Sequence, residues 1–213
     1  MESVKELSRH PSPGGRPQPL AYRDGTLWMG AWDTDTIYAI EPRSWKVIDQ
    51  MAAPGRPYGI APVGDYLQLV VSIGEDDDRY FYRFTPGEGF DDDSKTPCPE
   101  FTGSHLISDG STLYMTQMGF RRILELDKDL NTRREIALPT RCGGIGLRDG
   151  TFYMITADDE FDNLELATLD VSMSAPQAAP VAVMPPEARA LAWDGSAWWT
   201  SHREESRIAS FEV

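Results

Sequence analysis

The chain has 213 residues, a formal net charge of −14 and a sequence pI near 4.5. This acidity argues against nucleic acid and anionic membrane surfaces as partners, because both attract clustered lysine and arginine. No stretch approaches the roughly 18 apolar residues of a membrane span, and the N-terminus lacks the apolar core of a signal peptide. We therefore expect a cytoplasmic protein whose partner is a small-molecule ligand or substrate.

The two cysteines predict neither a disulfide framework nor a redox motif. Cys98 and Cys142 are far apart in the sequence and form no C-x-x-C pair. We expect both to be small buried residues.

A motif that begins at Leu20 returns along the whole chain. Each copy starts with an aliphatic residue, passes through a turn and places a second large apolar residue seven positions later. The copies cover Leu20–Met29, Ile60–Leu69, Leu106–Met115, Ile145–Met154 and Leu191–Thr200. Their first residues, the anchors, are spaced by 40, 46, 39 and 46 positions. A period of this size indicates a solenoid, a propeller or another array.

The segments that follow each copy predict two further strands. Alternating third strands are expected at Thr36–Ile40, Arg79–Phe84, Arg122–Leu126, Asn163–Leu169 and Arg207–Val213, and more polar fourth strands at segments such as Trp45–Met51, Thr132–Leu138 and Pro180–Met184. Four short strands per repeat are typical of a propeller blade. The sequence therefore predicts an all-β, five-bladed propeller that forms one domain over residues 1–213, with blades at about 17–55, 56–102, 103–140, 141–186, and 187–213 together with 1–12.

The two ends of the chain are expected to complete the same blade. The fifth copy stops after its third strand, whereas Ser3–Ser8 precedes the first copy and has the alternation of an unpaired strand. Pairing of these ends would close the ring and leave few exposed strand edges. His10 lies in or just after this N-terminal strand, and we expect it to be solvated.

The innermost strand of a blade begins, and its second strand ends, at the same mouth of the central channel. We call the residues at these points the rim set. The starts of the inner strands contribute Gln18–Pro19, Tyr58–Gly59, Ser104–His105, Gly143–Gly144 and Arg189–Ala190. The ends of the second strands contribute Trp32–Asp33, Ser72, Gln117–Met118, Thr156–Asp158 and Ser201–Arg203. The copies agree least at these positions, so any function is expected there.

Two of the three histidines belong to the rim set. His105 and His202 lie on blades three and five, which face each other across a narrow ring. Imidazoles at such a mouth suit general acid–base catalysis or a divalent metal of zinc, copper or calcium type. The metal ligands would be His105 and His202 with Asp33 and Asp158, which lie in acidic loops. Alternatively, the histidines only bind backbone groups and the acidic loops are solvated turns.

Other rim residues are candidates for substrate binding. Arg189, Tyr58, Gln18 and Gln117 would orient a substrate, and Trp32 would form a wall of the site because it lies outside the repeated aromatic positions. The sequence has no phosphate loop, dinucleotide fingerprint or serine elbow. We therefore expect no nucleotide cofactor and no serine nucleophile.

The repeat resembles two groups of small bacterial propellers. Gln18–Pro19–Leu20 and the segment Ser108–Met115 are similar to motifs of the five-bladed glutaminyl cyclase (glutamine cyclotransferase) family. Tyr58–Gly59–Ile60–Ala61 resembles the repeats of streptogramin-lyase and gluconolactonase-like propellers, which place a metal and histidines at the channel mouth. Met29 stands where the cyclase family has a glutamate.

The sequence leaves two classes of function open. The first is an enzyme of lyase, cyclase or lactone-hydrolase type that acts on a small molecule at the channel mouth, with His105 and His202 as its catalytic or metal-binding groups. The second is a non-catalytic propeller that binds a ligand or a protein on the same face. A propeller can host either function, so the residues of the site must decide.

Overall fold

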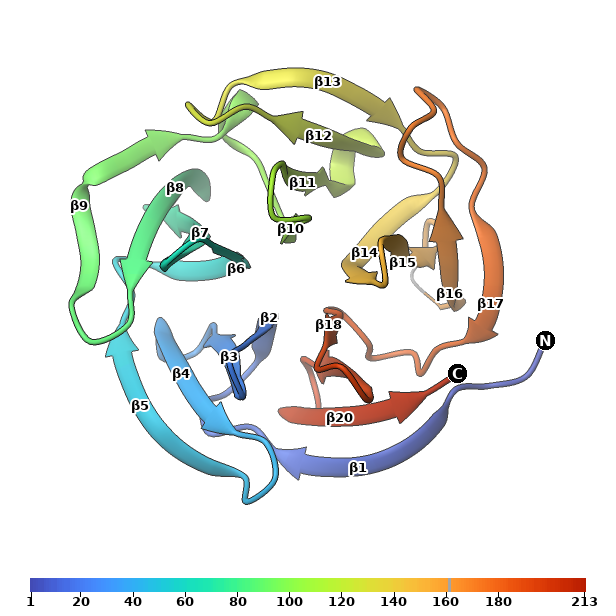
Figure 1. Ribbon diagram of the computed structural model, residues 1–213, viewed down its shortest axis with the longest axis horizontal. Helices are drawn as coiled ribbons and strands as arrows, with labels where there is room; N and C mark the ends of the chain where they lie inside the picture. The colour runs from blue at the N-terminus through green and yellow to red at the C-terminus, as the bar shows by residue number, and fades with distance from the viewer. Residues whose placement is uncertain (161) are drawn as a thin grey trace.

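The computed structural model describes residues 1–160 and 162–213. The described residues form five four-stranded antiparallel sheets around a central channel, so the predicted five-bladed propeller is confirmed (Figure 1). None of the helices in the described part of the chain is both long and apolar enough to cross a membrane.

The strands follow one another from the channel outward in each of the first four blades. Blade one contains β2 (Pro17–Arg23), β3 (Thr26–Ala31), β4 (Thr36–Glu41) and β5 (Lys46–Ala52); blade two contains β6 (Arg56–Val63), β7 (Tyr66–Ile73), β8 (Asp78–Thr85) and β9 (Gly89–Pro97). Blade three contains β10 (Leu106–Ser108), β11 (Leu113–Gln117), β12 (Arg122–Leu126) and β13 (Thr132–Ala137); blade four contains β14 (Arg141–Arg148), β15 (Thr151–Ala157), β16 (Leu164–Leu169) and β17 (Ala179–Val183). Short 3₁₀ turns at η1 (Pro99–Phe101) and η2 (Met118–Phe120) flank β10 and β11.

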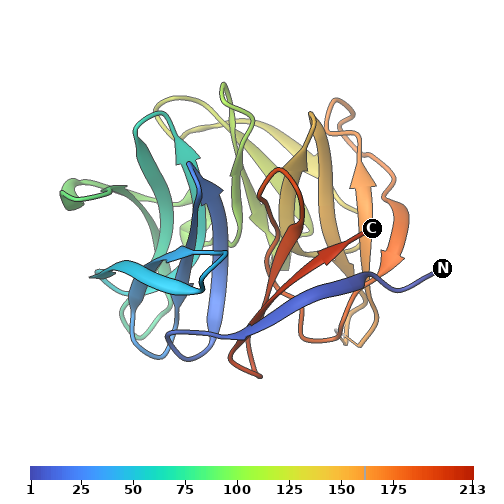
Figure 2. The same cartoon turned by 60° about the horizontal axis from the view of Figure 1, so that its bottom comes forward.

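Blade five joins the two ends of the chain. It contains β18 (Ala192–Trp193), β19 (Trp198–His202), β20 (Arg207–Glu212) and, as its outer strand, β1 (Lys5–Pro11). The register of β1 runs from Lys5 opposite Glu212 to Pro11 opposite Arg207. The expected ring closure is therefore confirmed, although the strand begins later than the predicted Ser3. Figure 2 shows β1 lying along the C-terminal strand.

The residues before β1 extend the closure to the neighbouring blade. Ser3 forms a parallel bridge with Val183 of β17, and the Val4 nitrogen donates to the Val183 carbonyl over 3.0 Å. The N-terminal segment thus links blades four and five. These contacts add a non-covalent link between two blades that the chain also connects directly, from β17 to β18.

The alternation of each second strand explains how the blades pack. In β3, Leu27 and Met29 pack against Trp199 of blade five, whereas Trp28 packs against Ile60 of blade two. Because successive side chains of a strand point to opposite faces, one strand supplies apolar groups to two blade interfaces. The repeat is thus the sequence signature of five similar interfaces.

The turn of the repeat requires backbone in the left-handed region. Asp24 and Gly25, between β2 and β3, have φ values of 49° and 82°, and Asp149 and Gly150 have 50° and 77°. Two successive positive φ values define a type I′ hairpin turn, which favours Asp-Gly. This requirement explains the D-G pairs of blades one and four; in blades three and five only the glycine has a positive φ, and Asp109 and Asp194 accept hydrogen bonds from backbone nitrogens of the turn.

His10 differs from its expected solvated position. Its ring is half-buried and stacks on Trp45 with a centroid distance of 4.2 Å and an interplanar angle of 14°. Trp45 in turn stacks on Trp199 at 5.9 Å. The outer strand β1 therefore contributes an aromatic contact to the closure of the ring. The polar alternation of the N-terminal segment did not predict this contact.

Candidate functional site

A cavity of about 270 Å³ opens at the mouth where the inner strands begin. It receives residues from every blade, and seven of its ten described lining residues are polar or charged. Its lining consists of Gln18, Trp32, Tyr58, Arg79, Ser104, His105, Met118, Gly143, Arg189 and Arg203. We call it the mouth cavity.

Two repeat positions account for most of this lining. The residues two positions before the anchors all line the cavity: Gln18, Tyr58, Ser104, Gly143 and Arg189. The residues twelve positions after the anchors line it in blades one, three and five: Trp32, Met118 and Arg203. All lining residues except Arg79 belong to the rim set. Arg79 lies in a third strand, which the prediction of the rim did not include.

His105 occupies a position that the other blades fill with a small residue. The position directly before the anchor is proline, glycine or alanine elsewhere, and a Cβ on Gly59 would lie 2.2 Å from the Ser104 carbonyl oxygen. His105 therefore has the one large side chain among the five residues at this repeat position. Its backbone nitrogen donates to Thr116 Oγ1 over 2.9 Å, which fixes the start of β10.

The His105 ring contacts Gln18 of blade one. The Nε2 atoms of the two side chains lie 3.4 Å apart, so an amide hydrogen of Gln18 points at the ring. Burial lowers the pKa of His105 to about 3, and the positive charges of Arg189, Arg203 and Arg79 act in the same direction. His105 is therefore neutral near pH 7, and the Gln18 contact favours the tautomer whose Nε2 carries no proton.

The other end of the Gln18 amide is unsatisfied. Gln18 is only 6% exposed, and its Oε1 atom has no hydrogen-bond partner within the described part of the chain. A buried polar atom without a partner is costly unless a ligand or water supplies one. Gln18 is thus prepared to bind a hydrogen-bond donor that enters the cavity.

Trp32 and Tyr58 form an aromatic wall. Their ring centroids are 4.7 Å apart, and Trp32 Nε1 donates to the Pro57 carbonyl over 2.6 Å. The Tyr58 hydroxyl donates to both carboxylate oxygens of Asp77, at 3.2 and 3.1 Å. Burial raises the pKa of Tyr58, so its hydroxyl stays protonated. The wall is held by its own hydrogen bonds and needs no ligand to form.

Arg79 is tied to the same wall. Its guanidinium carbon lies 3.7 Å from the Tyr58 ring centroid, and its Nη2 donates to Asp77 over 2.9 Å. Burial alone would raise the pKa of Asp77, but hydrogen bonds from Ser72 and Arg79 outweigh it and lower that pKa. Asp77 stays ionised and neutralises Arg79, so this pair fixes the geometry of the wall.

Two predicted residues, Gln117 and His202, do not line the cavity. Both lie eleven positions after their anchors, one position before the residues that do. Successive residues of a strand point to opposite faces, so their side chains turn between blades. Gln117 Nε2 donates to the Pro99 and Thr102 carbonyls over 2.8 and 2.9 Å and braces the loop before β10.

His202 is also buried away from His105. It is 1% exposed, and the charged groups that influence it are Arg9, Glu205, Glu6 and Glu187, none of which lines the mouth cavity. Burial lowers its pKa. Neither ring nitrogen has a hydrogen-bond partner within residues 1–160 and 162–213. The two histidines are therefore not brought together at this site.

The acidic residues predicted as metal ligands lie outside the cavity. Asp33 is exposed, and Asp158 accepts from the Asp162 nitrogen and from Asn163 Nδ2, over 2.9 and 2.6 Å, within its own loop. Across the described residues, no group of three or more His, Cys, Asp or Glu side chains is placed to hold a metal ion. The residues present at the mouth do not fit the predicted metal.

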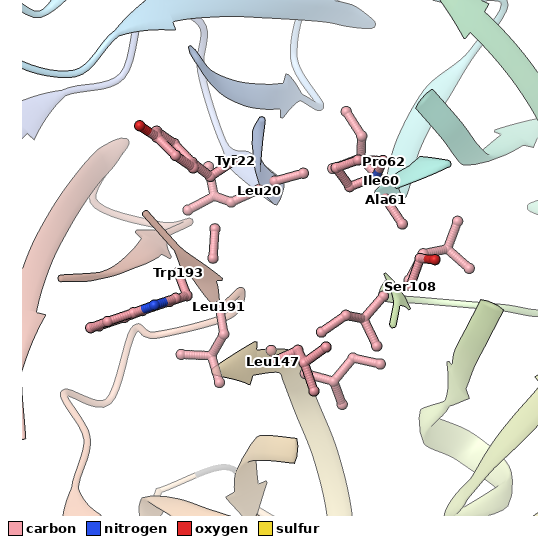
Figure 3. A pocket seen from close by; sticks show the side chains of 15 residues that line it. Leu20, Tyr22, Ile60, Ala61, Pro62, Ser108, Leu147, Leu191 and Trp193 are labelled. Carbon is pink, nitrogen blue, oxygen red and sulfur yellow. The ribbon is translucent and has the colours of Figure 1, made fainter. Parts of the chain in front are cut away.

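A second cavity of about 190 Å³ lies further along the channel, and most of its lining side chains are apolar. Side chains of all five inner strands surround it, including Leu20, Ile60, Leu147, Leu191 and Trp193 (Figure 3). No charged side chain occurs among the described residues of its lining. It offers packing surface and no acid–base group, so the mouth cavity is the candidate site.

The fold is shared with several enzymes of known structure. The chain is similar to the glutaminyl cyclase of Myxococcus xanthus, with a TM-score of 0.72 and 13% identity over 99% of this chain and 98% of that one. It is also similar to the virginiamycin B lyase of Staphylococcus aureus, with a TM-score of 0.54 and 16% identity over 96% of this chain and 68% of that one. A PQQ-bound aldose sugar dehydrogenase of Streptomyces coelicolor matches with a TM-score of 0.59 and 14% identity, over 99% and 81% of the two chains.

These similarities confirm the resemblance to cyclase and lyase propellers at the level of the fold. No protein-family model matches the sequence, and no curated protein matches it. Identities of 13–16% carry no information about individual site residues. Function has to be argued from the mouth cavity itself.

Proposed function

We propose that this protein is an enzyme that acts on a small molecule in the mouth cavity, by a reaction of lyase, cyclase or lactone-hydrolase type. The observation that carries the proposal is the contact between neutral His105 and Gln18 inside a cavity whose lining residues are mainly polar or charged. A volume of about 270 Å³ suits a small metabolite, near the lower end of the usual range for ligand sites. The enzymes with the same fold support the proposal as relatives in architecture.

The proposed chemistry needs one proton acceptor and one binding group. His105 Nε2, which the Gln18 contact leaves unprotonated, would accept a proton from the substrate once the bound substrate displaces the Gln18 amide hydrogen from that lone pair. Gln18 Oε1, which is buried and lacks a partner among the described residues, would accept a hydrogen bond from the substrate. Trp32 and Tyr58 would cover one side of the bound molecule. No metal or nucleotide takes part in this proposal.

A non-catalytic binding protein is the second candidate. The pKa of His105, about 3, makes the imidazole a weak base in the free protein, since an efficient general base titrates near the working pH. Met29 also replaces the glutamate of the cyclase family. Both observations favour binding without turnover.

One experiment separates the two candidates. The purified protein is assayed for turnover, and for ligand-induced thermal stabilisation, with glutaminyl substrates, virginiamycin B and a panel of lactones. His105→Gln is the test variant and His10→Gln is the matched control on the outer strand. An enzyme predicts that His105→Gln loses turnover but keeps stabilisation by the ligand, whereas His10→Gln keeps both.

The other outcomes are equally clear. Stabilisation without turnover in the unmodified protein would support the binding protein. If the His105→Gln variant keeps its turnover, His105 is not required for the reaction. If no compound in a broad panel stabilises the protein, the mouth cavity is not a small-molecule site.

A further inference from the structure

The mouth cavity is cationic although the protein is strongly acidic. Three arginines line it, and no Asp or Glu occurs among the described lining residues, while the whole chain carries a net charge of −14. Two further guanidinium groups, those of Arg16 and Arg56, lie 5.3 and 5.4 Å from the Trp32 ring centroid. Positive charge is thus gathered at the one cavity that also holds the neutral His105.

The three lining arginines have different surroundings. Arg79 is neutralised by Asp77 and donates to the Gly103 carbonyl, so its guanidinium belongs to the wall of the cavity. Arg203 lies 4.7 Å from the Trp32 ring centroid, and its Nε forms an ion pair over 2.8 Å with Glu204, an exposed carboxylate that Arg16 also contacts. Its two terminal nitrogens have no hydrogen-bond partner within the described part of the chain. Arg203 therefore retains donors for a ligand.

Arg189 completes a pair of like charges. Its Nη1 donates to the Pro186 and Ala188 carbonyls over 3.0 and 2.9 Å, which sets the direction of the side chain. Burial and then the charge of Arg203 lower the pKa of Arg189, while Glu187 and Glu204 oppose that shift. Two guanidinium groups that repel each other beside a cavity are stabilised by an anion placed between them.

We propose that the ligand of the mouth cavity carries a carboxylate, and that Arg189 and Arg203 bind it. A guanidinium group can donate two parallel hydrogen bonds to the two oxygens of a carboxylate. Such charge-assisted hydrogen bonds are stronger than hydrogen bonds between neutral groups. Phosphate sites commonly add backbone amides at the N-terminus of an α-helix, whereas the residues at this mouth belong to strands, loops and the three-residue 3₁₀ turn η2. The uncharged part of the ligand then faces Gln18 and His105.

This inference rests on the proposed function, since it assumes that the mouth cavity binds a small molecule. It also adds a link between binding and chemistry. The charges of Arg189 and Arg203 help to keep the imidazole of His105 neutral. A bound carboxylate offsets those charges and makes the imidazole more basic when the substrate is present.

The test compares acids with their uncharged amides. Succinate and benzoate are the anionic probes, succinamide and benzamide are their neutral counterparts, and inorganic phosphate is a third arm. Binding is measured by thermal shift and calorimetry at low and moderate salt. We expect the carboxylates to stabilise the protein, the amides to have little effect, and the carboxylate affinity to fall as salt rises.

Arginine variants locate the site. Arg203→Gln is expected to weaken carboxylate binding by about tenfold or more, because it removes a charged hydrogen-bond donor. Arg203→Lys should keep part of the affinity, since it retains the charge without the fork. Arg43→Gln, at an exposed residue in the turn between β4 and β5, is the matched control and should bind as the unmodified protein does.

Each result decides between the two proposals. If the amides bind as tightly as the acids, or if Arg203→Gln binds carboxylates unchanged, the carboxylate inference is wrong while a small-molecule site remains. If phosphate binds more tightly than either carboxylate, the ligand class is wrong. If neither charged nor neutral probes bind, and the wider panel also fails, the proposed function is wrong as well. The comparison of acids with amides uses the unmodified protein, so it holds even if a variant fails to fold.

Discussion

Replacing His105 by glutamine should reduce the amount by which the free energy of unfolding falls in mild acid. His105 is 5% exposed, and burial together with nearby arginines lowers its pKa from the ordinary 6.5 to about 3. Between these two values the unfolded chain binds a proton that the folded protein does not. Stability therefore falls as the pH drops below 6.5, and it continues to fall until about pH 3.

The size of this effect follows from the two pKa values. Each pH unit between them costs about 1.4 kcal/mol. From pH 7 to pH 5, His105 alone should lower the free energy of unfolding by about 2 kcal/mol. Glutamine cannot titrate, so His105→Gln should lose about 2 kcal/mol less than the unmodified protein over this interval.

Urea unfolding at pH 7 and pH 5 measures the effect directly. Packing lost in the variant lowers stability at both pH values and cancels in the difference. The other two histidines, whose pKa values burial also lowers, are present in both proteins and cancel as well. Equal losses in the two proteins would show that His105 titrates normally, and the argument for a neutral imidazole at the site would fail.

Three further predictions concern the scaffold. Gly59→Ala should destabilise the protein by about 1–3 kcal/mol in urea unfolding, because the new Cβ would lie 2.2 Å from the Ser104 carbonyl oxygen. Deleting residues 1–11 should lower the Tm by at least about 10 °C and promote association, since it removes β1 and exposes the edge of β20. Asp194→Ala should cost about 2–4 kcal/mol in the same unfolding assay, because the carboxylate accepts from two backbone nitrogens and from Trp199 Nε1, each over 2.7 Å.

Matched controls isolate each cause. Gly119→Ala places a Cβ where no heavy atom lies within 4 Å and should be close to neutral. Deleting only residues 1 and 2 leaves β1 intact and should keep most of the Tm. Asp65→Ala removes an exposed carboxylate and should cost little. If a control costs as much as its partner, the explanation offered for that partner is refuted.

The repeat alone predicted the blades and their closure. Anchors such as Leu20 and Ile60 recur because every blade interface buries the same kind of apolar side chain. The same residue types therefore return in the sequence at a regular spacing. The unpaired strand at the N-terminus and the missing strand at the C-terminus followed from counting strands. The aromatic contact of His10 did not, since Trp45 lies on another blade, 35 positions away.

The sequence predicted only part of the site, because which residues line the cavity depends on the direction of their side chains and on contacts across the ring. Gln18, Tyr58 and His105 were expected at the mouth from topology, and the structure brings them together in one cavity. His202 was expected there as well, but a shift of one position along β19 turns its side chain between blades. The sequence could not show that Arg79, from a third strand, reaches the mouth.

The sequence by itself determined the architecture, and the tertiary structure decided the character of the site. A blade that is repeated five times leaves a period in the sequence, and this period can be detected from the residues alone. A site is not repeated, and its charge is the sum of single residues from different blades, such as Arg189 and Arg203 near the neutral imidazole of His105. The net charge of −14 gave no sign of a cationic cavity, although the rim set contained Arg189 and Arg203, because electrostatic interactions at a ligand site depend on charges within a few ångströms and not on the overall composition.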